Sequence, residues 1–152
     1  MDDQYKYILD YLPFKSSFRF VDSISFIDEN RVSGRYTLRK DAFFYEDHFK
    51  DRPVTPGVIL IEIMAQIGMV TLGIYNLLFV SSEDPVKGKF FPIFTSTEVE
   101  FFKMVLPGET VEVRAEKKYY RLNKLKCHVE MYDLKNELIA RGNFAGIIKS
   151  AQ

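Results

Sequence analysis

Apolar and polar residues alternate along most of the second half of the chain. A period of two is typical of strands that bury one face, and short turns usually join antiparallel neighbours. The pattern predicts about four antiparallel strands, at residues 94–105, 110–122, 124–134 and 138–148, separated by turns at LPGE, Asn123 and KNE.

The first half of the chain also contains short predicted elements separated by turns. Residues 4–12 favour a short helix that ends at Leu12-Pro13. Apolar residues at positions 18, 20, 24 and 26 favour a strand over 18–26, followed by a turn at 28–30 and a return strand over 31–38. We therefore expect a β-hairpin, followed by an ordered loop over residues 39–56.

Residues 57–80 form a long apolar run, and the thirty residues between Arg52 and Glu83 carry one formal charge, Glu62. The run is long enough to span a membrane, but Glu62, Gln66, Asn76 and three glycines argue against a span. We favour a helix buried in protein, with Thr55 as its N-cap and Pro56 in its first turn. No membrane span is expected.

The order of these elements predicts an α+β fold. One long helix, placed after a hairpin and before several antiparallel strands, is best buried by a curved antiparallel β-sheet that wraps around it. The length of 152 residues suits a single domain, 1–152. Because the helix is apolar nearly all round, a second subunit is expected to cover part of it.

Net charge and cysteine content bear on possible binding partners and on the cellular compartment. Lys plus Arg and Asp plus Glu both total 21, so net charge offers no argument for binding nucleic acid. Cys127 is the only cysteine, which excludes an intrachain disulfide and a multi-cysteine metal site and suits a reducing cytoplasm. Its alternating surroundings favour a buried structural thiol, and the N-terminus shows no export signal.

The carboxylate inside the apolar helix is the main candidate for chemistry. Burial would raise the pKa of Glu62 and keep it partly protonated, so that it could donate a proton. His48, fourteen residues earlier, could accept one as a neutral imidazole. Gly57, at the expected helix N-terminus, offers a free N–H to a polarised carbonyl oxygen. Gln66, one turn after Glu62, could orient the carboxyl group or a water.

Each of these residues also has a purely structural interpretation. His48 could be an exposed or hydrogen-bonding loop residue, and Glu62 could bind a backbone group or lie at a dimer interface. The combination with the Pro-x-x-Pro-Gly segment between them favours a catalytic site.

The segment HFKDRPVTPGVILIEIMAQ, residues 48–66, resembles the signature of the 3-hydroxyacyl-[acyl carrier protein] dehydratases of type II fatty acid synthesis. LPFKSSFRFVDSI and VEFFKMVLPGETVEV are similar to two further segments of that family, in the same order. The resemblance covers nearly the whole chain.

The resemblance implies the hotdog fold, a long central helix wrapped by an antiparallel sheet, in a homodimer whose sites pair His48 of one subunit with Glu62 of the other. His48 would remove the α-proton of a 3-hydroxyacyl thioester held on acyl carrier protein, and Glu62 would protonate or position the leaving hydroxyl. Gly57 N–H would bind the thioester carbonyl, Val54 C=O would orient His48, and Gln66 would help hold the released water. No metal or other cofactor is implied, and a trimer of dimers is consistent with the family.

The chain departs from the family pattern at Asp47, Lys50 and Thr55, where Gly, Pro and Met are usual. These changes favour a specialised member, in a secondary lipid, polyene or polyketide pathway. Aromatic residues are candidates for an acyl tunnel or, for most of them, the core: Phe43, Phe44, Phe49, Phe90, Phe91 and Phe94. An acidic carrier protein would need a basic patch, for which the candidates are Lys87, Lys89, Lys117, Lys118, Arg121, Lys124 and Lys126.

Two alternatives remain open. A hotdog acyl thioesterase would hydrolyse the thioester, although such enzymes usually place their carboxylate differently. A noncatalytic acyl-carrier-binding partner subunit would keep the fold without the chemistry, although the intact His48 and Glu62 favour an enzyme.

Overall fold

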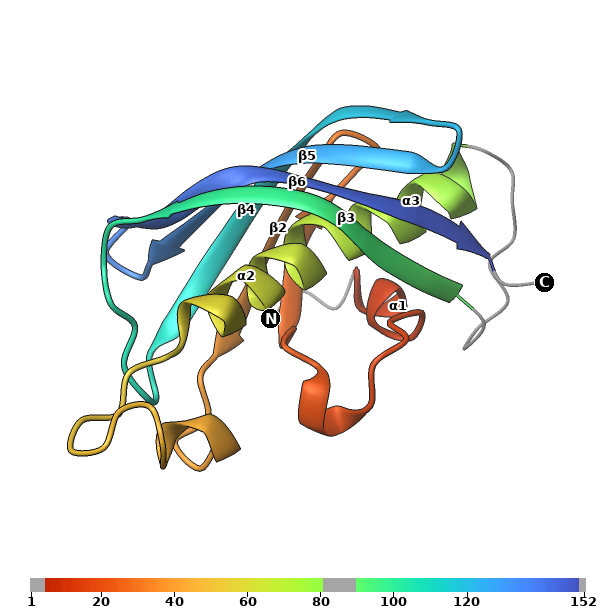
Figure 1. Cartoon of the computed structure of the whole chain (residues 1–152). Coiled ribbons are helices and arrows are strands. Elements are labelled where there is room, and N and C mark those ends of the chain that lie inside the picture. The colour runs from red at the N-terminus through yellow and green to blue at the C-terminus, as the bar shows by residue number, and fades with distance from the viewer. Residues whose placement is uncertain (1–4, 81–89, 151–152) are drawn as a thin grey trace.

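The computed structural model describes residues 5–80 and 90–150 of the chain. One long helix crosses the concave face of a curved sheet, and the short helix α1 (Lys6–Leu9) lies beside the C-terminal part of that helix (Figure 1). This arrangement confirms the predicted α+β class and the sheet wrapped around a central helix.

The sheet has six strands in the order β1-β2-β4-β5-β6-β3, and every neighbouring pair is antiparallel. Its strands are β1 (Ser23–Ile27), β2 (Arg31–Thr37), β3 (Phe90–Phe101), β4 (Thr110–Arg121), β5 (Lys124–Asp133) and β6 (Leu138–Ser150). Alternating side chains of β4 and β5 are buried, as a period of two requires when one face covers a helix. β1 and β3 form the two edges.

The central helix runs in three parts: α2 (Gly57–Ala65), a π-helical turn η3 (Gln66–Val70) and α3 (Thr71–Phe79). Residues Gly57–Phe79 are long and apolar enough to cross a membrane, with a mean hydropathy of 2.0 over an 18-residue window, but 72% of that window is buried inside the protein. The helix is therefore mostly buried in the protein, as predicted.

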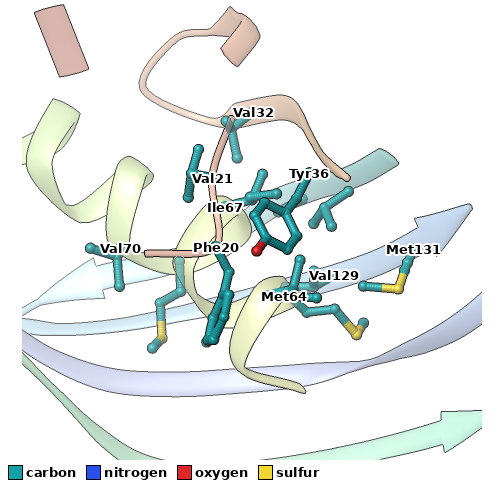
Figure 2. Close-up of a cluster of buried hydrophobic side chains, with 14 of the residues drawn as sticks. Phe20, Val21, Val32, Tyr36, Met64, Ile67, Val70, Val129 and Met131 are labelled. Carbon is teal, nitrogen blue, oxygen red and sulfur yellow. The ribbon is translucent and has the colours of Figure 1, made fainter. Parts of the chain in front are cut away.

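The core fills the space between helix and sheet. Ile67 and Met64 of the helix, Phe20 and Tyr36 of the N-terminal segments and Val129 of β5 pack into one cluster (Figure 2). Each buried side chain of this size stabilises the fold by roughly 1.5–3 kcal/mol relative to an exposed one. The helix approaches the sheet closely at Gly68, where a Cβ atom would lie 2.9 Å from Val129 Cγ1 and 3.1 Å from Ala115 Cβ.

Three predicted boundaries are wrong. β1 begins at Ser23 instead of residue 18, because Phe18 ends a 3₁₀ turn, η1 (Ser16–Phe18), and the Phe20 N–H binds the side chain of Gln66 instead of a strand. β3 begins and ends four residues earlier than expected, at Phe90 and Phe101. After the helix, the sequence SSEDPVKGK interrupts the apolar pattern and predicts a break; these residues, 81–89, lie outside the described residues.

The third error is the helix N-cap. Pro56, not Thr55, is the N-cap of α2, and no side chain caps the helix. The Thr55 hydroxyl is engaged elsewhere, with Tyr45 of the 3₁₀ turn η2 (Phe43–Tyr45).

Candidate active site

His48 lies in the tight loop between η2 and α2, and its ring is held by the main chain. Nδ1 lies 2.8 Å from the Val54 carbonyl oxygen. Because a carbonyl can only accept, the neutral ring carries its proton on Nδ1, which leaves the Nε2 lone pair available as a base. The Val54 N–H in turn donates to the His48 carbonyl at 2.8 Å.

The segment between these two residues is a closed turn. Phe49 and Arg52 exchange main-chain hydrogen bonds of 2.7 and 3.3 Å. The Phe49 ring stacks on the His48 ring with centroids 4.0 Å apart. The turn therefore limits the directions that the His48 ring can take.

Gly57 is the first residue of α2. Among the residues that the structure describes, its N–H has no hydrogen-bond partner, and it lies at the positive end of the helix dipole. A Cβ at this position would lie 3.3 Å from the Phe101 ring, so a larger residue would crowd the space in front of the helix. The free N–H can donate to an oxygen that develops negative charge.

Glu62 lies one turn further along α2 and is partly buried. Burial raises the pKa of its carboxyl group, and a hydrogen bond from Gln66 Nε2 to Glu62 Oε2, 2.9 Å long, lowers it in part. The net direction is upward, which increases the protonated fraction. Such a carboxyl group is suited to act as a general acid.

Gln66 is fully buried and its amide is committed to the protein. Its Oε1 accepts from the Phe20 N–H at 2.8 Å, and Nε2 donates to the Phe18 carbonyl at 2.9 Å and to Glu62. Both amide hydrogens are used within the chain, and one of them holds the Glu62 carboxyl group; the expected role of helping to hold the released water stays a prediction.

The structure therefore joins the predicted residues in two groups. His48 contacts Val54, and Glu62 contacts Gln66, but within the described part of the chain no hydrogen bond or ion pair joins His48 to Glu62. The two groups are therefore separate in the hydrogen-bond network of one chain.

One feature of the loop was not anticipated. Tyr45 and Thr55 are both buried, and their hydroxyl groups lie 2.5 Å apart. The sequence contains no signal for this pair, because the two residues are ten positions apart in an irregular segment.

The other candidate residues behave differently from expectation. Phe43, Phe49, Phe91 and Phe94 are exposed and do not pack in the core of a single chain, which corrects the interpretation of most aromatics as core residues. Phe44 is partly buried against the core, and the Phe90 side chain is not described.

The candidate residues for a basic patch differ in exposure. Lys117 points inward and donates to Asn76 Oδ1 at 2.9 Å. Lys118, Arg121 and Lys124 are exposed at the β4–β5 hairpin, while Lys87 and Lys89 lie outside the described residues. Within the ranges 5–80 and 90–150, no cluster of His, Cys, Asp and Glu side chains could hold a metal ion.

A family model described as a FabA-like domain matches residues 12–139. The chain belongs to the FabA-like family. Curated relatives of this FabA-like chain include two proteins named 3-hydroxyacyl-[acyl-carrier-protein] dehydratase FabZ. The one from Acinetobacter baylyi is 32% identical over 109 residues, 72% of this chain and 70% of the relative. The one from Rickettsia rickettsii is 29% identical over 143 residues, 93% of each chain.

Solved structures confirm the hotdog fold of the FabA-like chain. The dehydratase heterocomplex ApeI:P from Xenorhabdus doucetiae superposes with a TM-score of 0.75 at 14% identity, covering 94% of this chain and 91% of that one. A hypothetical thioesterase with coenzyme A from Streptococcus pneumoniae reaches 0.60 at 8% identity, with coverages of 86% and 90%. At such identities the likeness concerns the fold alone, and the predicted family is confirmed by the family match.

Proposed function

We propose that the chain dehydrates 3-hydroxyacyl thioesters carried on acyl carrier protein to trans-2-enoyl thioesters. The observation that carries this proposal is the pair of prepared groups: a His48 ring whose Nδ1 is fixed on Val54, and a Glu62 carboxyl group whose pKa is raised by burial. The FabZ names of the curated relatives support the substrate class.

The proposed reaction uses these groups in sequence. His48 Nε2 takes the proton from C2 while the Gly57 N–H stabilises the thioester oxygen, on which negative charge develops. Glu62, held by Gln66, gives its proton to the hydroxyl on C3. The C3–O bond breaks, the C2=C3 double bond forms and water leaves; a proton then returns from His48 to Glu62.

The site is proposed to form between two subunits of a homodimer. Within the described residues no hydrogen bond or ion pair joins His48 to Glu62, and β3 is an edge strand with exposed apolar side chains at Phe91 and Ile93. An exposed apolar edge strand is a surface that a second copy can pair with. A trimer of such dimers stays a prediction.

Acyl carrier protein is the proposed partner, and the cytoplasm the proposed location. The exposed cations of the β4–β5 hairpin, Lys118, Arg121 and Lys124, suit an acidic partner. The burial of the one helix in the described ranges that is long enough to cross a membrane argues against a span, and the single free Cys127 suits a reducing cytoplasm.

The first test is the absorbance of the enoyl thioester after mixing the protein with 3-hydroxyacyl carrier proteins of several chain lengths. His48→Ala and Glu62→Gln should each lower kcat by about 10²- to 10⁴-fold. His128→Ala and Glu116→Gln, on the inner strands β5 and β4, are the matched controls and should keep activity. Release of free thiol instead of enoyl product would favour the thioesterase, and tight carrier binding without turnover would favour a noncatalytic partner subunit.

A second test asks whether the site is shared. Subunits of His48→Ala and Glu62→Gln, each inactive alone, are exchanged at equal amounts to form mixed dimers. If each site takes one residue from each subunit, half of the dimers carry one intact site, and about a quarter of wild-type activity should return. Mixed dimers that stay inactive would overturn the shared site.

A further inference from the structure

The loop that holds His48 is closed by two buried hydroxyl groups. Tyr45, three residues before His48, is 6% exposed, and Thr55, directly after Val54, is 3% exposed. Their hydroxyl oxygens lie 2.5 Å apart. Each is the hydrogen-bond partner that the other needs in a buried position.

The peptide between Val54 and Thr55 connects this pair to the His48 ring. Its N–H donates to the carbonyl oxygen of fully buried Val105 at 2.9 Å, and its C=O lies 2.8 Å from His48 Nδ1. In a planar trans peptide the C=O and N–H point in opposite directions. Fixing the N–H on Val105 therefore aims the C=O at His48.

Rotation of this peptide would move the acceptor away from Nδ1. The Tyr45–Thr55 hydrogen bond opposes that rotation. It ties Thr55, whose N–H belongs to this peptide, to Tyr45 at the end of η2, where the chain enters the loop. Hydrogen bonds in series also polarise one another, so the bond to Val105 makes the Val54 oxygen a better acceptor.

We propose that Tyr45 and Thr55 are positioning residues that hold the Val54 carbonyl on His48 Nδ1, and so keep the His48 Nε2 lone pair free for the substrate. The proposal rests on the proposed function of His48 as a base. Among the described residues no hydrogen bond joins Tyr45 or Thr55 to His48. Thr55 replaces a residue that is usually Met in the family pattern, so this hydrogen-bonded pair is a feature of this chain.

The test compares Tyr45→Phe, Thr55→Val and the double variant. Each single change leaves one buried hydroxyl without its partner, whereas the double change removes both, so the double variant should recover much of the thermal stability lost by the single ones. Tyr120→Phe and Thr71→Val are the matched controls, since each removes one hydroxyl that binds a main-chain carbonyl far from the loop.

Two measurements separate positioning from stability. We expect kcat to fall by about two- to tenfold in all three variants with KM unchanged, the size of one neutral hydrogen bond. We also expect the nitrogen NMR signals of His48 at alkaline pH to shift from the Nδ1–H form towards the Nε2–H form. The chain has two histidines, and His128→Gln assigns them.

The outcomes are distinct. A double variant that recovers kcat together with stability, or variants in which the His48 tautomer is unchanged, would overturn the proposal. The NMR measurement needs no substrate, so it decides the role of the pair even if the wild type dehydrates nothing. Failure of the wild type to act on any thioester would instead overturn the proposed function.

Discussion

The Glu62 side chain is partly buried on α2, and burial raises its pKa above the usual 4.5. A carboxyl group with a raised folded-state pKa favours folding fully below its unfolded pKa, and this contribution is lost as the pH rises through the folded pKa. At neutral pH an amide at this position should therefore be more stable than the carboxylate.

We accordingly expect Glu62→Gln to raise Tm at neutral pH by on the order of 2 °C while abolishing dehydration. The gain should disappear below pH 4.5, which thermal unfolding across a pH series would measure. Glu116→Gln, at an exposed position on the inner strand β4, is the control and should change Tm little at any pH. A Tm gain independent of pH would contradict the explanation.

Cys127 shows how burial controls reactivity at a single residue. The thiol is fully buried on β5, and burial raises its pKa to about 12, with Lys117 lowering it in part. Only the thiolate reacts, so iodoacetamide at neutral pH should leave Cys127 unmodified in the folded protein and alkylate it in denaturant. Mass spectrometry of both samples measures this, and modification without unfolding would refute the expected protection.

At the scale of elements, the contact between η3 and the sheet depends on Gly68. Alanine would improve helix propensity by about 0.5–1 kcal/mol, but its Cβ would overlap Val129 and Ala115, and such overpacking typically costs 1–3 kcal/mol. The larger effect should win, so Gly68→Ala should lower the free energy of unfolding by about 1 kcal/mol or more in urea titrations. Leu134→Ala, at an exposed turn, should stay near wild type.

The turn of the β4–β5 hairpin contains a residue, Leu122, whose backbone conformation is unfavourable for its side chain. Leu122 and Asn123 both have positive φ, 51° and 64°, and Leu122 is 96% exposed. Two-residue hairpin turns of this kind favour Asn at the first position. Leu122→Asn should therefore increase the free energy of unfolding by about 0.5–1 kcal/mol. Leu134→Asn, without a positive φ, should not, and an equal gain there would contradict the conformational reason.

At the scale of the whole molecule, the proposed activity depends on a second subunit at the β3 edge. Ile93 lies on this strand and is 57% exposed. A charge there should block strand pairing, so Ile93→Asp should give a monomer by light scattering and lose dehydration, because in the proposed dimer the partner subunit supplies the carboxyl group. Leu134→Asp is the control. An active monomer would show that one chain completes the site.

The sequence by itself determined the parts of this protein that follow from local periodicity and from a short motif. Alternation at Val111, Val113, Leu125 and Val129 is enough to define β4 and β5, because a strand with one buried face needs a period of two. A continuous apolar run is enough for a buried helix, and the segment of residues 48–66, supported by two further segments, was enough to identify the family.

Tertiary structure alone decided which groups meet. The hydrogen bonds of Gln66 with Phe18 and Phe20 cross almost fifty positions and displace the expected strand start, and those of Thr55 with Tyr45 and Val105 displace the expected N-cap. A polar side chain takes whichever partner packing brings within about 3 Å, and no local pattern records that choice. The periodicity therefore specified the elements, while long-range packing selected the partners that orient the acid and the base.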